Sequence, residues 1–264
     1  MNIFLHELKA YRKSMIIWAC SMAALAALYI FIFTGLASDI EAFKDVLKSL
    51  PEVVRKLLSL YVESISTLEG FYSFAFVYIV LCGAIQAMNL GVSIVSKEVR
   101  EKTADFLLTK PVSRKRILTS KLLAVLASLI ITNIIYLAII VPLTLTAKSQ
   151  FNMGVFLMIT ATLFFVQLMF AALGVLVSVT AHKIRSVISI SLSTVFGFFI
   201  ISMLGSVIGE KAIRYLSPFK YFDLAYIVQN AAYETRFIVI DIAFVIAVTA
   251  TSYLIYMKKD IHAV

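Results

Sequence analysis

Six long apolar runs alternate with short charged stretches along this chain, and this pattern sets its fold class. The runs cover residues 14–38, 70–96, 121–147, 154–181, 186–209 and 237–257. A helix needs about 20 apolar residues to cross the hydrocarbon core of a bilayer, and each run is long enough. The pattern therefore predicts an all-α membrane protein with six transmembrane helices, built as one domain over residues 1–264.

Composition supports the same class and narrows the chemistry. At 264 residues and 61% hydrophobic, the chain has more apolar surface than a soluble domain of this length could bury. The first run is too long for the core of a cleaved signal, so we expect it to remain as a membrane anchor. Cys20 and Cys82 lie inside apolar runs, which favours neither a disulfide framework nor a cysteine metal site.

Three segments outside the runs are amphipathic. Residues 1–13 place their apolar side chains near one helical face, which predicts an interfacial helix before the first span, with a frayed tail as the alternative. Residues 39–69 have helical spacing broken by Pro51 and predict two short helices that either line a gate or cap the bundle. Residues 210–236 combine interfacial aromatics with Pro218, which favours a short helix dipping into the outer leaflet.

The distribution of cations predicts the orientation. With the N-terminus inside, fifteen of the 24 Lys and Arg residues fall in cytoplasmic segments, and eight of these lie in residues 97–121. The positive-inside rule therefore favours a multi-pass protein of the plasma membrane with both termini cytoplasmic, most typical of a prokaryote. The net charge of +9 is divided among separate loops, so we expect no nucleic-acid partner.

Few polar residues interrupt the runs. Gln86, Asn89, Asn133 and Gln167 either bond across packed helices or line a transport pathway. Asp241 is costly in hydrocarbon, and two interpretations are open for it. Its carboxylate reaches water or Arg236 near the outer headgroups, or it contacts substrate or protons.

Enzyme motifs are missing from the sequence. It has no G-x-x-x-x-G-K-[ST] phosphate loop, no H-E-x-x-H and no G-x-S-x-G, and its three histidines are not clustered. We therefore expect no enzyme activity and no cofactor on this chain. Uphill transport would need a coupling ion or a partner protein.

The basic segment 97–121 points to a protein partner. Residues 98–108 predict a short helix that Pro111 ends, and Ser113 is a predicted N-cap for the helix entering the third span. The cations at 114–116 would oppose the dipole of that helix unless phosphates or an acidic protein surface meet them.

Residues 96–124 resemble the E-x-E-x-x-T-x-x-x-L-L-x-x-P-V-S-R-x-x-I-L-x-x-K pattern of ABC-2 type permeases, the membrane subunits of ATP-binding cassette exporters. Lys102 stands where the family often has Gly. The amphipathic start of the chain and residues 217–223 resemble two weaker family motifs, and the branch for copper-enzyme maturation and antibiotic export is similar.

The resemblance implies a dimer of six-span permeases, with a second copy or a homologous permease, bound to two cytoplasmic ABC ATPase subunits that hold ATP and Mg. A coupling helix between spans two and three would carry ATPase motion to the membrane. Residues implied in ATPase coupling are Glu98, Glu101, Thr103, Leu107, Leu108, Pro111, Ser113 and Arg114.

Three functions follow as alternatives. The first is an exporter permease for a hydrophobic or amphipathic substrate, surrounded by membrane lipid. The second is a membrane subunit that transmits ATPase motion to an extracytoplasmic partner without solute passage. The third, an ion-coupled carrier, is disfavoured because Asp241 is the sole ionisable candidate in the spans and no broken-helix pair recurs.

Overall fold

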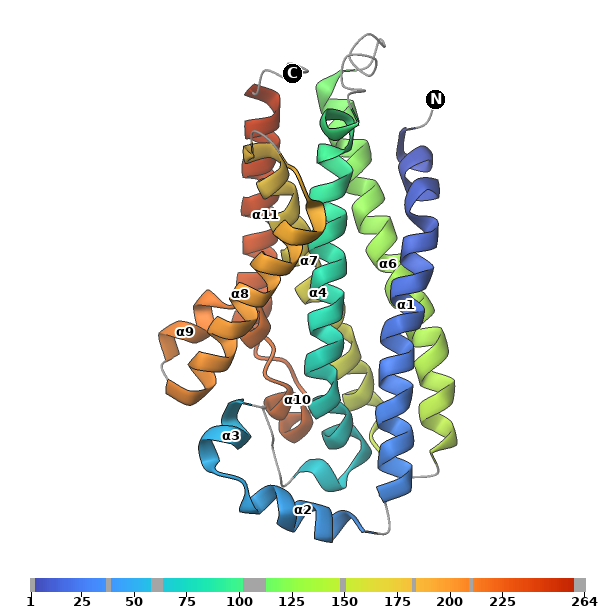
Figure 1. Ribbon diagram of the computed structural model, residues 1–264, viewed down its shortest axis with the longest axis vertical. Coiled ribbons are helices and arrows are strands. Elements are labelled where there is room, and N and C mark those ends of the chain that lie inside the picture. The colour runs from blue at the N-terminus through green and yellow to red at the C-terminus, as the bar shows by residue number, and fades with distance from the viewer. Residues whose placement is uncertain are drawn as a thin grey trace.

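The computed structural model is a bundle of long helices (Figure 1). It describes residues 3–36, 39–57, 64–101, 113–147, 151–181, 184–208 and 211–258, and these contain no strand. Six of the helices are long and apolar enough to cross a membrane, which confirms the predicted fold class. They are α1 (Ile3–Leu36), α4 (Leu68–Arg100), α6 (Arg114–Thr146), α7 (Met153–Thr180), α8 (Val187–Ile208) and α11 (Thr235–Lys258).

Both chain ends lie at one end of the bundle, here called the terminal end, and helix α2 (Ile40–Ser49) lies across the opposite end, called the α2 end (Figure 1). The end of α4 and the start of α6 are also at the terminal end. An even number of spans places the two termini on the same side, as the sequence pattern predicted.

Helix α1 differs from the prediction for the start of the chain. Residues 3–13 are the first turns of one continuous helix that runs to Leu36, and no separate interfacial helix precedes the span. Glycine and proline are absent between Ile3 and Thr34, so nothing breaks the helix there. The side chains of Glu7 and Tyr11 contact α4, which holds these turns along the bundle.

Helices α4 and α7 form the centre of the bundle and bury the largest share of their apolar windows. Their backbones approach closely at glycine. A Cβ atom added to Gly91 would lie 2.4 Å from the carbonyl oxygen of Ala171, and one added to Gly174 would lie 2.6 Å from that of Met88. At such short distances only the hydrogen atom of a glycine fits between the two helices, which is typical of close helix pairs in membranes.

The α2 end is covered by two short helices, α2 and α3 (Glu52–Leu57), which Pro51 separates as predicted. Leu47 of α2 is buried, and the ring of Phe43 lies 6.4 Å from that of Phe71 on α4. The apolar face of α2 therefore packs against the end of the bundle.

A re-entrant segment joins α8 to α11. It consists of α9 (Lys211–Leu216), the 3-10 turn η2 (Pro218–Lys220) and α10 (Leu224–Asn230). The hydroxyl of Ser217 donates to the carbonyl oxygen of Phe198, and the ring of Phe219 lies 5.1 Å from that of Phe170.

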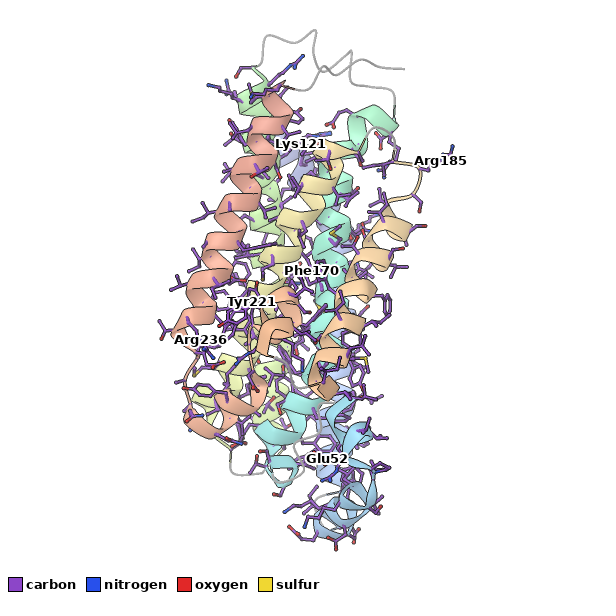
Figure 2. The ribbon with its side chains drawn as sticks, turned by 90° about the vertical axis from the view of Figure 1, so that its left-hand side faces the viewer. Glu52, Lys121, Phe170, Arg185, Tyr221 and Arg236 are labelled. Atoms are coloured by element: carbon purple, nitrogen blue, oxygen red, sulfur yellow. The ribbon has the colours of Figure 1, made fainter. Side chains whose placement is uncertain are left out.

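These contacts set the depth of the re-entrant segment. Phe170 is 17 residues from the first residue of α7, or about 25 Å at 1.5 Å per residue. Phe198 is at the middle of α8. Figure 2 shows Phe170 and Tyr221 at nearly the same height along the bundle. The turn η2 thus reaches the middle of the bundle.

Candidate functional site

The terminal end of the bundle contains a buried ion pair between α4 and α6. Lys121 is 1% exposed, and its ammonium donates hydrogen bonds to the Glu98 carboxylate and to the carbonyl oxygen of Ile94. This interaction ties the last turns of α4 to the first turns of α6, on both sides of the segment predicted to couple.

Two further helices are fixed to the same region. On α1, the carboxylate of the buried Glu7 lies 3.7 Å from the Lys97 ammonium, and the hydroxyls of Tyr11 and Ser93 are 2.8 Å apart. On α11, the Tyr253 hydroxyl lies 3.3 Å from that of Thr119 on α6. The turns of α4 and α6 that the pair of Glu98 and Lys121 joins are here called the tied helix bases. A displacement of these turns of α4 would therefore act on α1 and α6 together.

Four of the residues predicted to couple are described. Glu98 forms the ion pair, Glu101 is exposed just beyond α4, and Arg114 is the first residue of α6. The Ser113 side chain accepts a hydrogen bond from the backbone N–H of Arg116 at 3.4 Å, so its predicted N-cap role is confirmed. The other four lie outside the described residues: Thr103, Leu107, Leu108 and Pro111.

Sequence reasoning missed Lys121 as part of this site, although a signal was present. Lys121 is the first residue of the third apolar run, and a lysine there needs a partner to be buried. The pairing of Glu7 with Lys97 had no comparable signal, because 90 residues separate them in the chain.

A second polar cluster joins α4, α6 and α7 deep in the bundle. The Gln86 amide donates to the hydroxyl of Thr132 at 3.0 Å, and the Gln167 amide donates to the Gln86 carbonyl at 3.1 Å. The Asn133 amide completes the cluster by donating to the Gln167 carbonyl at 2.6 Å. Three of the four predicted pathway amides are thus mutually bonded, an arrangement that suits packing between helices.

The remaining predicted pathway residues stand apart. Asn89 is half-buried and takes no part in the cluster. Asp241 is 1% exposed, and its carboxylate has no hydrogen-bond partner within the described ranges. Arg236 instead bonds Glu234 at 3.2 Å and lies over the ring of Phe237, so its predicted contact with Asp241 is not formed.

A cavity of about 260 Å³ lies between the re-entrant segment and helices α4, α7 and α8, and we call it the re-entrant cavity. Its wall includes two cations and one carboxylate. Arg214 is paired with Glu234, and the Asp223 carboxylate accepts from the backbone N–H groups of Ala225 and Tyr226 at the start of α10.

Burial shifts the pKa of two groups in and beside the re-entrant segment. The pKa of the Lys220 ammonium is lowered by burial, an effect that nearby Asp223 opposes. Burial raises the pKa of the Tyr233 hydroxyl to about 12. That hydroxyl donates to the carbonyl oxygen of Met158 at 2.6 Å, so it fixes the segment to α7 as a neutral group.

The sequence was compared with known families after this geometry was established. The profile of ABC-2 family transporter proteins matches residues 1–261. The chain belongs to the ABC-2 transporter family. An ABC-2 membrane protein is a permease subunit of an ABC transporter, generally not itself catalytic, and it works with an ABC ATPase. A comparison with curated proteins gave no match.

Family membership gives the geometry of this ABC-2 permease a context. The ion pair between Glu98 and Lys121 flanks the segment for which the family resemblance implies ATPase contact. Within the described ranges, no group of three His, Cys, Asp or Glu side chains could hold a metal ion. The tied helix bases, the amide cluster and the re-entrant cavity are the polar features that the structure offers for a functional proposal.

Proposed function

We propose that this ABC-2 permease exports a hydrophobic or amphipathic substrate, driven by two cytoplasmic ABC ATPase subunits that dock on residues 97–121. A second copy or a homologous permease completes the complex, and the ATPases bind ATP and Mg. In this arrangement the terminal end faces the cytoplasm and the α2 end faces outward. The cation excess at the terminal end supports that orientation.

The observation that carries the proposal is the buried ion pair between Glu98 and Lys121. The segment that an ATPase would push is joined to α4 on one side and to α6 on the other. Because the Lys121 ammonium bonds both the carboxylate and the Ile94 carbonyl, the two helix bases move as one unit. Motion of the segment is then transmitted into the bundle rather than absorbed by fraying of α4.

The central helix pair would carry this motion along the bundle. Helix α4 packs closely on α7 at Gly91 and Gly174, and the amide cluster joins both helices to α6. Packed helices of this kind move as rigid elements, because sliding would break several buried hydrogen bonds at once. A shift at the terminal end therefore reaches the re-entrant cavity, which α4 and α7 also line.

ATPase docking can be tested with one charge reversal and a matched control. Glu101→Lys changes an exposed carboxylate at the end of α4, and Glu41→Lys makes the same change on the exposed face of α2. The permease is co-expressed with its cognate ABC ATPase and purified from detergent. We expect Glu101→Lys to lose most of the ATPase and Glu41→Lys to retain it. Equal retention by both variants would contradict docking at residues 97–121.

Export itself is tested in vesicles reconstituted with the complex. ATP-dependent movement of a labelled amphiphile across the bilayer supports the exporter. ATP turnover without any flux would instead favour the alternative function, in which the permease transmits ATPase motion to an extracytoplasmic partner. Gradient-driven flux without the ATPase would contradict both.

A further inference from the structure

Lys220 contributes a cation to the wall of the re-entrant cavity. Its ammonium makes no hydrogen bond or ion pair with any residue in the described ranges, although the side chain is half-buried. Arg214, on the same wall, differs because Glu234 pairs with it and the Phe237 ring lies 4.0 Å beneath it. Asp223 on the same wall acts on the Lys220 ammonium only from a distance, without an ion pair, so the ammonium can still accept an anionic partner.

A second polar group faces the same space. Ser202 of α8 is 6% exposed and lines the cavity, and its hydroxyl bonds no group in the part of the chain described here. The other hydroxyls on the wall already donate to backbone carbonyls, at Gly70, Ile159 and Ser202. Among the ammonium and hydroxyl groups of the wall, those left for a ligand are the Lys220 ammonium and the Ser202 hydroxyl.

The rest of the wall is apolar. It is formed by the side chains of Val77, Val80, Val166, Phe199, Phe219 and Phe222. Ligand pockets for drug-sized molecules span roughly 300–1,000 Å³, so a cavity of about 260 Å³ holds a headgroup with its adjoining carbons rather than a whole lipid. An inorganic anion would leave the apolar wall without contacts, and a neutral lipid would leave the ammonium unpaired.

We propose that the re-entrant cavity binds an amphiphile through an anionic phosphate headgroup, with Lys220 as the counterion and Ser202 as a hydrogen-bond donor. Because η2 reaches the middle of the bundle, the headgroup is held well below the surface at the α2 end. The Asp223 carboxylate does not cancel this site, since two backbone N–H groups already compensate it. The inference concerns a ligand site and stands whether or not the permease moves a solute, because binding needs no ATPase.

Binding is measured on the purified full-length permease in neutral detergent. The probes are phosphatidylglycerol and diacylglycerol, which lacks the phosphate, each carrying the same fluorescent label on one acyl chain. We expect the wild type to prefer phosphatidylglycerol, and Lys220→Gln to weaken that binding about tenfold, as loss of a charge-assisted hydrogen bond predicts. Lys220→Arg should keep the preference. The matched control is Lys48→Gln, which neutralises an exposed lysine on α2 that does not line the cavity.

Several outcomes would overturn the proposal. These are equal binding of the two lipids by the wild type, unchanged phosphatidylglycerol binding by Lys220→Gln, and an equal loss in Lys48→Gln. Glycerol 1-phosphate has a phosphate headgroup without acyl chains, so we expect it to bind much more weakly than phosphatidylglycerol. Equal binding of the two would mean that the apolar wall contributes nothing to affinity and would also contradict the proposal. If the Lys220→Gln variant does not elute from size-exclusion chromatography as a folded protein, the Ser202→Ala variant is measured instead. A selective loss of phosphatidylglycerol affinity in Ser202→Ala supports the site. Unchanged affinity in Ser202→Ala contradicts it.

Discussion

Single polar side chains decide which helices of this bundle stay together. Lys121 and Glu98 are unequal partners, because the Lys121 side chain is 1% exposed whereas that of Glu98 is 17% exposed. Without its partner, the Glu98 carboxylate can still reach water. The Lys121 ammonium cannot, so it would remain buried and unpaired, which is the costly case for an ion pair.

This asymmetry gives a prediction for the two single variants. Glu98→Ala should lower the free energy of unfolding by about 3 kcal/mol, because it leaves a buried ammonium without its partner. Lys121→Met should cost only about 1 kcal/mol, close to the loss of one hydrogen bond. The measurement is unfolding of the purified permease in mixed micelles, followed by circular dichroism.

The double variant provides the control. Glu98→Ala combined with Lys121→Met removes both charges, so its stability should lie near that of Lys121→Met alone. A double variant as unstable as the sum of the two single changes would mean that the residues act independently. A larger cost for Lys121→Met than for Glu98→Ala would contradict the burial argument.

The amide cluster offers a second prediction at this scale. Gln167→Leu removes bonds to Gln86 and Asn133, and interhelical hydrogen bonds of this kind are each worth about 0.6–1.7 kcal/mol. We expect Gln167→Leu to lower stability by about 1–2 kcal/mol. Asn89→Leu, at a half-buried amide outside the cluster, should change stability by less than about 0.5 kcal/mol.

Flux measurements on the same two variants separate packing from a pathway role. If these amides only hold helices together, Asn89→Leu should transport normally, and the loss in Gln167→Leu should follow its loss of folded protein. A fall in flux for folded Asn89→Leu would instead favour the pathway interpretation.

At the scale of the helix, the sequence predicted that each spanning helix exists better than it predicted where each helix begins and ends. Four of the six spans begin and end within four residues of the apolar runs, because a bilayer demands about 20 apolar residues in a row. Helix α6 nevertheless starts at Arg114, seven residues before the apolar run at Lys121, since a charged helix can continue into water once Ser113 caps it. Helix α1 begins even earlier, because its polar first turns pack on α4.

The depth of the re-entrant segment was not predictable in the same way. Aromatic residues and Pro218 indicate an interfacial segment that is not one straight helix, but neither sets how far it enters the bundle. That depth depends on which rings it meets, here Phe170 on α7 and Phe199 on α8. Both partners belong to apolar runs whose neighbours in space the sequence does not reveal.

Close packing of α4 on α7 predicts a sharp contrast between two glycines. Gly174→Ala would put a methyl group 2.6 Å from a backbone oxygen, so the two helices must separate, at a cost of about 1–3 kcal/mol. Gly197→Ala on α8 meets nothing within 4 Å and should be neutral or slightly stabilising. Thermal unfolding in detergent measures both. Equal midpoints for the two variants would show that α4 and α7 are not in tight contact.

For the whole molecule, the arrangement of the spans separates the tied helix bases from the helices that cover the opposite end. The tied helix bases lie at the terminal end with both chain ends, while α2, α3 and the entrance of the re-entrant segment lie toward the α2 end (Figure 1). An ATPase can therefore act on the tied bases only where the terminal end faces the cytoplasm. Orientation is the property on which the proposed coupling depends most.

Thiol labelling tests that orientation directly. Cys20 and Cys82 are first replaced by alanine, and single cysteines are then introduced at Lys9 near the start of α1 or at Asp45 on α2, both of which are exposed. In bacterial spheroplasts, a membrane-impermeant maleimide should label Asp45→Cys at once and Lys9→Cys only after the membrane is permeabilised. The cation excess at the terminal end predicts this order, because Lys and Arg near span ends are retained on the cytoplasmic side. The reverse order would put the α4–α6 segment outside the cell, beyond the reach of any ATP-driven partner.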